Sequence, residues 1–382
     1  MTRRLVLLGL LAAALAGAGA HAAPKPLVIG VTISQTGSAA GTAAYVLQGY
    51  QRWVGDANHH GGLLGRPVEL KVYDDKSDPA TAAALYRTLI TEDKVDLIAG
   101  PYASAVSQAV IPVTEELHRV LIGQTAGTSL FDGTHYAVQG FPQGATYLPA
   151  VADLAKASGY RTVALLANDS PGTVEICAGL RARAQALGLT VVLDRVYPRS
   201  TTAFGPYAAQ AKAAGADVIA GCAFLPDSIA LARELDKQGV QAKMRVFSIG
   251  PTDPTFGRTL GPVAEGVFGS TTWWPSLKTK GNADFVASFE KTFGRTPVYH
   301  SAEAYASLQV LAAAVRQVGS LDQAKIRAAL GSMRRDTVVG TFRLDPEGRQ
   351  VGYSSYLMQW QDGVQKLVWP KAVAEAAPRL PS

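Results

Sequence analysis

The chain has 382 residues, of which 48% are hydrophobic and 17% are charged, a composition that excludes disorder, collagen and coiled coil. This length predicts two lobes of about 100 to 200 residues each. The 36 Lys and Arg against 30 Asp and Glu give a formal net charge of +6, so we expect no nucleic-acid partner.

The first 22 residues are typical of a secretory signal peptide. Arg3 and Arg4 precede an apolar run over residues 5–15, and the segment ends in Ala20-His21-Ala22. The apolar run is shorter than the roughly 20 residues of a membrane-spanning helix, which favours cleavage after Ala22 over an anchor. No cysteine stands there for lipid attachment, so we expect a soluble product outside the inner membrane.

From residue 27 onward, short β-branched runs alternate with longer helical patterns. The first series predicts strands at 27–33, 68–73, 95–99 and 120–122, with helices around 46–57, 80–92 and 104–116 between them. Such an alternation implies a parallel sheet with helices on both faces.

A second series begins near residue 144. It predicts strands at 162–166, 190–196, 217–220 and 245–249. It also predicts one helix that begins near 144, one that ends at 187, and two that span 207–214 and 228–238. Two more helices follow the segment 266–275, and short strands are expected over 338–369. The predicted fold class is therefore α/β, with two doubly wound parallel-sheet lobes.

Cys177 and Cys222 are the two cysteines of the chain. An oxidising compartment permits a disulfide between them, but a bridge requires a Cα separation that the sequence does not give. Two buried free thiols are the alternative.

The chain has no phosphate-binding loop, nucleophile elbow or zinc-binding helix. Residues 74–79 have a metal-like acidic pattern, but they lack the Gly and terminal Glu of a calcium loop, and Asp78-Pro79 is a helix-start signal. His59 and His60 precede two glycines in a predicted surface turn. We therefore expect no metal, no cofactor and no enzymatic activity.

The loops at 100–104 and 123–128 follow adjacent predicted strands. Ligands of parallel sheets bind beyond the carboxyl ends of the strands. Both loops offer hydroxyls and backbone N–H groups at the start of a helix or turn, which favours an anion or carboxylate. Ordinary helix capping by Ser104 and Thr128 is the alternative.

Several motifs in order resemble the periplasmic branched-chain amino acid binding proteins, the extracytoplasmic solute receptors of ABC importers. The resemblance spans nearly the whole chain after the predicted cleavage site. The motifs that carry it are Ile29-Gly30-Val31 through Gly37, Asn58 with Gly61-Gly62-Leu63-Leu64-Gly65-Arg66, Tyr73-Asp74-Asp75, Asp78-Pro79, Gly100 with Ser104, Ser270 through Trp274-Pro275, Phe293-Gly294-Arg295-Thr296-Pro297 and Gly340-Thr341-Phe342.

The resemblance implies a type I periplasmic binding protein fold, with two lobes joined by three crossing hinge strands. We expect residues 23–141 with 270–338 to form lobe 1, residues 142–269 with 339–372 to form lobe 2, and residues 373–382 to form a C-terminal tail. The expected crossings lie near 139–144, 266–270 and 334–340.

The resemblance also implies that Ser104, Thr128 and the backbone of Ala126 hold a ligand carboxylate. Ser38 and Tyr102, in the loops after the first and third strands, join this candidate site. In the second lobe the family's two aromatic positions fall near Gly172-Thr173 and near Phe224. These are candidate residues on the second side of the ligand.

The family's acidic partner for a ligand ammonium falls at Thr252 or Asp253. If Thr252 is the equivalent, a buried ammonium lacks its counter-charge, which is strongly unfavourable. Phe224, Trp273 and Trp274 lie in segments expected to border the cleft, and core packing or a surface position is the alternative for each. The sequence therefore favours an aromatic or branched aliphatic acid, and an amino acid is the alternative if Asp253 faces the ligand.

The predicted function is a periplasmic solute-binding protein that delivers a small carboxylate-bearing or amino-acid ligand to the ABC permease subunits in the inner membrane. We expect a monomer. The alternative is a ligand-sensing receptor component that docks a chemoreceptor or signalling partner.

Overall fold

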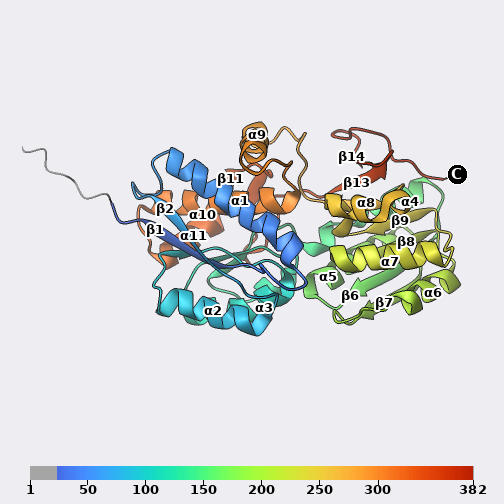
Figure 1. The fold of residues 1–382 in the computed structure, drawn as a ribbon, viewed down its shortest axis with the longest axis horizontal. Helices are drawn as coiled ribbons and strands as arrows, with labels where there is room; N and C mark the ends of the chain where they lie inside the picture. Colours follow the sequence, from blue (N-terminus) through green and yellow to red (C-terminus); the bar gives the residue numbers. More distant parts are fainter. Residues whose placement is uncertain (1–23, 382) are drawn as a thin grey trace, which may run out of the picture.

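Two α/β lobes lie side by side along the longest axis of the molecule in the computed structural model (Figure 1). The structure describes residues 24–381, so the predicted signal peptide lies outside the described residues. Within residues 24–381, no helix is both long and apolar enough to cross a membrane.

The first lobe is built on a parallel sheet in the order β2-β1-β3 and on a second parallel pair, β4-β5. A parallel bridge between Tyr102 and Gln124 joins the loops after β3 and β4. The elements of this lobe are β1 (Leu27–Thr32), α1 (Ala40–His59), β2 (Val68–Tyr73), α2 (Pro79–Thr91), β3 (Leu97–Ile98), α3 (Ser104–Glu116), β4 (Leu121–Gly123), η1 (Thr128–Phe131), β5 (Ala137–Gln139), α9 (Asn282–Phe293), α10 (Tyr299–Val318), α11 (Gln323–Ser332), β11 (Arg334–Asp336) and β12 (Thr341–Arg343).

Local sequence explains these elements. β1 is buried along nearly its whole length, as expected of a parallel strand covered on both faces. Asp78 accepts a hydrogen bond from the Thr81 N–H at 2.7 Å and Pro79 is the first helical residue, so α2 begins there. α1 approaches α10 closely at Gly49, where a Cβ atom would lie 2.2 Å from the Ser301 carbonyl oxygen.

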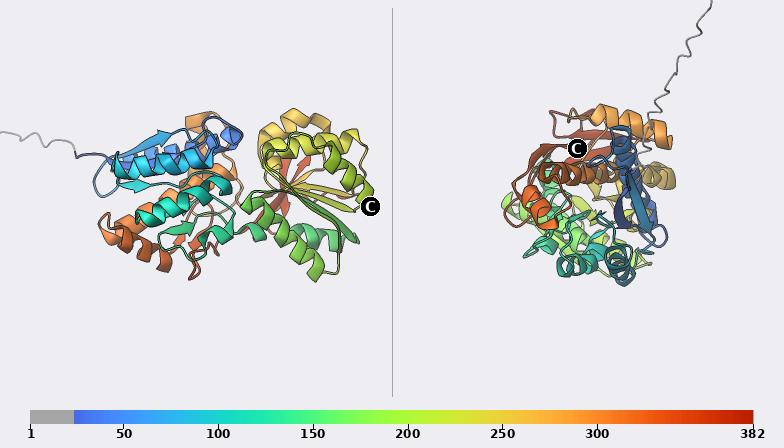
Figure 2. Two further views of the ribbon diagram at one scale, coloured as in Figure 1. Left: turned by 90° about the horizontal axis from the view of Figure 1, so that it is seen from below. Right: turned by 90° about the vertical axis from the view of Figure 1, so that its left-hand side faces the viewer.

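The second lobe contains a seven-stranded sheet in the order β14-β13-β10-β9-β8-β6-β7. Figure 2 shows helices on both faces of this sheet, with α4 and α5 in one apolar core and α6, α7 and α8 in the other. Its elements are η2 (Gly144–Thr146), α4 (Pro149–Ala157), β6 (Thr162–Asn168), α5 (Pro171–Ala186), β7 (Thr190–Tyr197), α6 (Gly205–Ala214), β8 (Val218–Cys222), α7 (Leu225–Lys237), β9 (Met244–Phe247), η3 (Gly250–Thr252), α8 (Pro254–Leu260), η4 (Gly261–Ala264), β10 (Phe268–Thr271), β13 (Tyr356–Gln361) and β14 (Val364–Trp369). A disulfide between Cys177 and Cys222 ties α5 to β8, which decides the question that the sequence left open.

The segments that connect the lobes meet in one apolar cluster, in which Phe141 and Trp273 are buried and against which Tyr353 packs. The third crossing comes later than the sequence indicates. Phe342 packs in the core of the first lobe with Leu344, because β12 pairs with β11. The chain therefore enters the second lobe between Leu344 and β13 rather than at residue 339.

The two predicted series of strands and helices are confirmed, and the structure adds the strands β5 and β10, which were not predicted. Strands β13 and β14 join the second sheet antiparallel, so that sheet is mixed rather than wholly parallel. The helices α8 and α11 were not predicted. Each begins after an Asp that caps it, Asp253 for α8 and Asp322 for α11.

Candidate functional site

Loops of the first lobe meet the N-terminus of α5 and the loop before α7 across the interface between the lobes. They enclose an inner cavity of about 20 Å³, which has room for one water-sized group. The inner cavity is lined by Tyr102, Ala103, Ser104, Gln124, Thr125, Ala126, Phe141, Tyr147, Gly172, Thr173, Ile176, Phe224, Ile249, Tyr299 and His300. None of these is a Lys, Arg, Asp or Glu, so a ligand here meets hydroxyl and amide dipoles.

Ser104 joins the two loops of the first lobe. It is the first residue of α3 rather than its cap, and its buried hydroxyl pairs with the Thr125 hydroxyl. The Gly127 N–H also donates to the Thr125 hydroxyl, at 3.1 Å. Ala103, just before Ser104, has a φ of 75°, a strained conformation that clusters at ligand sites. The loop is therefore shaped to present Ser104 to the cavity.

Thr128 lies at the edge of this cluster and does not line the inner cavity. Its hydroxyl donates to the Ala126 carbonyl and accepts from the Gln139 side chain, both at 3.3 Å. Its backbone N–H donates to Glu175 in the second lobe at 2.6 Å. The Ser129 N–H and hydroxyl donate to the same carboxylate at 3.0 and 2.6 Å. Sequence reasoning did not identify Glu175, which bridges the lobes.

The second lobe contributes the first turn of α5 and the residue before α7. Gly172 packs directly on the first lobe, since a Cβ atom there would lie 2.5 Å from the Ser104 hydroxyl oxygen and 3.2 Å from the Gly127 nitrogen. The Thr173 hydroxyl donates to the Asn168 and Ser170 carbonyls at 2.8 Å each. Phe224 meets Tyr102 edge to face, with ring centroids 6.3 Å apart.

Aromatic residues form the remaining walls, and sequence reasoning did not identify most of them. The Tyr102 hydroxyl lies 3.3 Å from the His300 Nε2 atom. Burial lowers the pKa of His300 to about 3, so the ring is neutral at pH 7, and it raises the pKa of Tyr102. Phe141 comes from the first crossing segment and Tyr147 from the start of the second lobe. Tyr147 has a buried hydroxyl without a hydrogen-bond partner among the described residues.

A buried carboxyl lies on α10, the helix that carries His300. Glu303 is fully buried and accepts a hydrogen bond from the Thr272 hydroxyl. Its other oxygen has no partner within residues 24–381. Burial raises the pKa of Glu303 well above its usual value of 4.5. Burial therefore favours the neutral form of this carboxyl.

Ser38 lines a second cavity of about 160 Å³, which we call the outer cavity. It lies between the lobes and shares Tyr102, Ala103 and Phe224 with the inner cavity. The structure thus brings five of the candidates to the inner cavity, and Ser38 to its neighbour. The five are Tyr102, Ser104, Ala126, Thr173 and Phe224.

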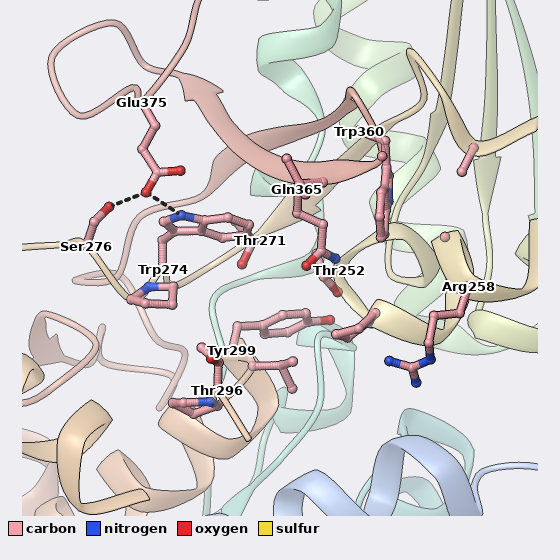
Figure 3. Close-up of a pocket in the computed structure, with 18 of the residues that line it drawn as sticks. Thr252, Arg258, Thr271, Trp274, Ser276, Thr296, Tyr299, Trp360, Gln365 and Glu375 are labelled. Carbon is pink, nitrogen blue, oxygen red and sulfur yellow. Dashed lines mark hydrogen bonds between the residues drawn. The ribbon is translucent and has the colours of Figure 1, made fainter. Parts of the chain in front are cut away.

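Thr252 and Asp253 line neither the inner nor the outer cavity. Thr252 donates to the Ile249 carbonyl at 2.7 Å, and Asp253 caps α8 by accepting from the Thr255 N–H at 2.8 Å. Thr252 also lines a groove of about 730 Å³ beside the crossing segments, which Figure 3 shows in close-up. Trp273 and Trp274 line this groove and not the inner cavity, and Trp274 donates to Glu375 at 3.0 Å.

The acidic segment after β2 has a structural role. Asp75 is fully buried and accepts from the Thr32 and Ser34 hydroxyls at 2.9 and 2.6 Å. Over residues 24–381, no group of three or more His, Cys, Asp and Glu side chains is arranged to hold a metal ion.

Known proteins share this architecture. The "Leu/Ile/Val-binding protein homolog 7" of Brucella suis biovar 1 (strain 1330) is 26% identical, with 95% of this chain and 96% of that protein covered. The crystal structure of a leucine-binding protein from Thermotoga maritima MSB8 matches with a TM-score of 0.82 at 21% identity, covering 89% of this chain and 97% of that one. A solute-binding protein of an ABC transporter from R. palustris, in complex with 4-hydroxybenzoate, matches with a TM-score of 0.80 at 23% identity, covering 93% and 98%.

These matches confirm the predicted fold class and the resemblance that the sequence indicated. The model of the periplasmic binding protein family matches residues 26–365. The chain therefore belongs to the periplasmic binding protein family.

Proposed function

We propose that this protein is the solute-binding component of an ABC importer and captures a small carboxylate-bearing ligand between its lobes. The observation that carries the proposal is the joining of two adjacent loops at the inner cavity. There the Ser104 hydroxyl, the Thr125 hydroxyl and the Gly127 N–H form one hydrogen-bonded group. Such neutral donors, at the carboxyl ends of parallel strands, suit a carboxylate.

The walls favour an apolar ligand body. Tyr102 and Phe224 line both the inner cavity and the outer cavity, and the outer cavity, at about 160 Å³, has room for an apolar group. Aromatic pairs add about 0.5 to 1.5 kcal/mol beyond area burial. The leucine-binding and 4-hydroxybenzoate-bound relatives are named for acids with an apolar body. We therefore retain aromatic acids, branched aliphatic acids and amino acids as the ligand class, with Ser104 and Ala126 on the carboxylate side. Thr128 supports this loop from outside the inner cavity, through its bond to the Ala126 carbonyl.

Binding should close the lobes about their crossing segments. The inner cavity is enclosed by residues of both lobes, so a ligand there gains contacts in the closed arrangement that the open one lacks. We keep the expected division into two lobes, with the third crossing moved beyond Leu344. The protein then acts as an exported periplasmic monomer, without enzymatic activity, that presents its ligand to the permease.

A thermal-shift screen of the purified protein tests this function. The panel contains amino acids, benzoates, branched aliphatic acids and, as a control, the amides of the same acids. A ligand that binds only the folded state adds about 2.7 kcal/mol of stability at one hundred times its dissociation constant. We expect acids to raise the melting temperature and the amides to fail. Equal shifts with acid and amide would refute the carboxylate assignment.

A further inference from the structure

The outer cavity has the features of a binding subsite. First-lobe residues such as Thr42 and Ser77 line one side of it, and second-lobe residues line the other: Asn168, Ser170, Arg199, Pro226 and Asp227. Its volume of about 160 Å³ is comparable to cavities that hold benzene. Tyr102 and Phe224 form a wall common to both cavities, so one ligand can extend from the inner cavity into the outer one.

Asp227 presents an acceptor to this cavity. It lies in the first turn of α7. The Asn168 amide and the Tyr197 hydroxyl donate to its Oδ2 atom, at 2.9 and 3.1 Å. Both donors meet the same oxygen, and no described residue donates to Oδ1. Burial raises the pKa of Asp227, and these two donors oppose the shift.

Ser170 supplies a second, independent observation. Its side chain is 2% exposed, lines the outer cavity and has no hydrogen-bond partner among the described residues. Buried polar groups are nearly always paired, so an unpaired one at a cavity indicates a missing partner. The Asn168 Oδ1 atom accepts from the Ser170 N–H at 3.0 Å, and the Asn168 amide nitrogen donates to Asp227. The Asn168 side chain therefore positions both Ser170 and Asp227.

The other charges at this cavity do not satisfy Asp227. Arg199 is the cation that lines it, but its guanidinium pairs with Asp169 at 3.1 Å and forms no ion pair with Asp227 within 4.0 Å. Asp253, the acidic candidate from the sequence, caps α8 through its Oδ1 atom and lines neither the inner nor the outer cavity. Asp227 is the carboxylate that lines the outer cavity, and its Oδ1 atom has no donor among the described residues.

We propose that the outer cavity binds the hydrogen-bond-donating end of the ligand, an ammonium or a hydroxyl group, with Asp227 Oδ1 and Ser170 Oγ as its partners. This inference rests on the proposed function, because the ligand's carboxylate is placed at Ser104. A donor at one end and a carboxylate at the other then define the transported acid.

Calorimetry with two matched ligand pairs tests the subsite. Leucine is compared with 4-methylpentanoate, and 4-hydroxybenzoate with benzoate, so each pair differs by one donor group. We expect Asp227→Asn to weaken binding of the donor-bearing member tenfold or more and to change its analogue less than twofold. The pair that responds distinguishes an ammonium from a hydroxyl. Asp236→Asn, an exposed change on the same helix, is the matched control and should bind like the unaltered protein.

Ser170→Ala is a second test of the subsite, which applies even if the Asp227→Asn variant misfolds. The Ser170 hydroxyl has no protein partner to lose, so this variant should fold normally and weaken the donor-bearing ligand severalfold. If Asp227→Asn weakens both members of a pair equally, or neither, the subsite assignment is wrong while the proposed function stands. If the unaltered protein binds none of the four acids, both are wrong.

Discussion

The bridge from Glu175 to η1 should stabilise the closed arrangement of the lobes. Glu175 belongs to α5 in the second lobe, and its carboxylate accepts hydrogen bonds from Thr128 and Ser129 in the first. An opening motion that separates α5 from η1 breaks these bonds and returns the groups to water. Glu175→Ala removes these hydrogen bonds between the lobes, and we expect the loss to favour the open arrangement.

The size of the effect follows from the exposure of each bond. The Thr128 bond is partly buried, whereas both Ser129 bonds are exposed. A hydrogen bond to a charged group contributes about 1.5 to 3 kcal/mol, and exposed charge interactions contribute little. Counting the Thr128 bond alone, Glu175→Ala shifts the closed-to-open ratio by a factor of about 10 to 150. If the free protein is mainly open, the dissociation constant rises by the same factor.

Calorimetry and small-angle scattering measure the two consequences. The radius of gyration of the unaltered protein should decrease on ligand binding, and Glu175→Ala should need a higher ligand concentration for the same decrease. Gln185→Ala is the matched control, because Gln185 is an exposed residue of the same helix. An unchanged dissociation constant and an unchanged scattering titration in Glu175→Ala would show that the bridge has no part in closure.

Three further predictions address the binding loop, the buried titrating pair and the disulfide. Ser104→Ala should weaken acid binding about tenfold or more in calorimetry, whereas Ser107→Ala, also buried on α3, should not; equal effects would contradict a carboxylate role for Ser104. Unfolded His300 and Glu303 titrate near 6.5 and 4.5, but folding lowers the first pKa to about 3 and raises the second. His300 binds its proton in the unfolded state alone between about pH 3 and 6.5, so its contribution to stability falls by about 1.4 kcal/mol per pH unit as pH falls through this range. Glu303 holds its proton in the folded state above pH 4.5, where the unfolded carboxyl has lost it, so its contribution falls as pH rises from 4.5 toward the raised folded pKa. The two contributions oppose each other where both groups titrate. When the unfolding free energy is measured in urea across pH, His300→Gln should remove the loss of stability toward low pH, and Glu303→Gln should remove the loss toward high pH. A profile that neither substitution changes would refute this account. Replacing both Cys177 and Cys222 by Ala should lower the unfolding free energy by about 4 kcal/mol, the chain-entropy value for a separation of 45 residues, and a reductant should then have no further effect.

The sequence predicted the bounds of a helix or strand correctly where its hydrophobic pattern was clear. α3 was predicted at residues 104–116 and β2 at 68–73, and both have these bounds in the structure. α8 and α11 were missed although Asp253-Pro254 repeats the Asp78-Pro79 start signal. These helices have seven and ten residues, too short for a repeating apolar face to stand out. The late third crossing depends on the pairing of β11 with β12, a tertiary contact without a sequence signal.

The candidate site was predictable where it lies on loops that follow consecutive strands. Tyr102 and Ser104 follow β3 and Ala126 follows β4, so the rule for parallel sheets brings them together. Tyr147, Tyr299 and His300 come from the crossing region and from α10, and in the sequence their patterns are those of ordinary core residues. Glu175 was not identifiable for a similar reason. In the sequence, a glutamate on a helix indicates a solvent-exposed position, and its contact with the other lobe is evident only in the folded structure.

The acidic partner of the ligand shows why family position alone was insufficient. Asp253 occupies the expected stretch, but it also precedes a proline at a helix start, and its carboxylate accepts the Thr255 N–H. That bond uses its Oδ1 atom, and Asp253 lines neither the inner nor the outer cavity. Asp227 does line the outer cavity, and Asn168 and Tyr197 both donate to its Oδ2 atom, an arrangement formed by three separate strand and helix ends. Discrimination among acids should therefore depend on Asp227, and the sequence could not reveal this before β6, β7 and α7 were brought together.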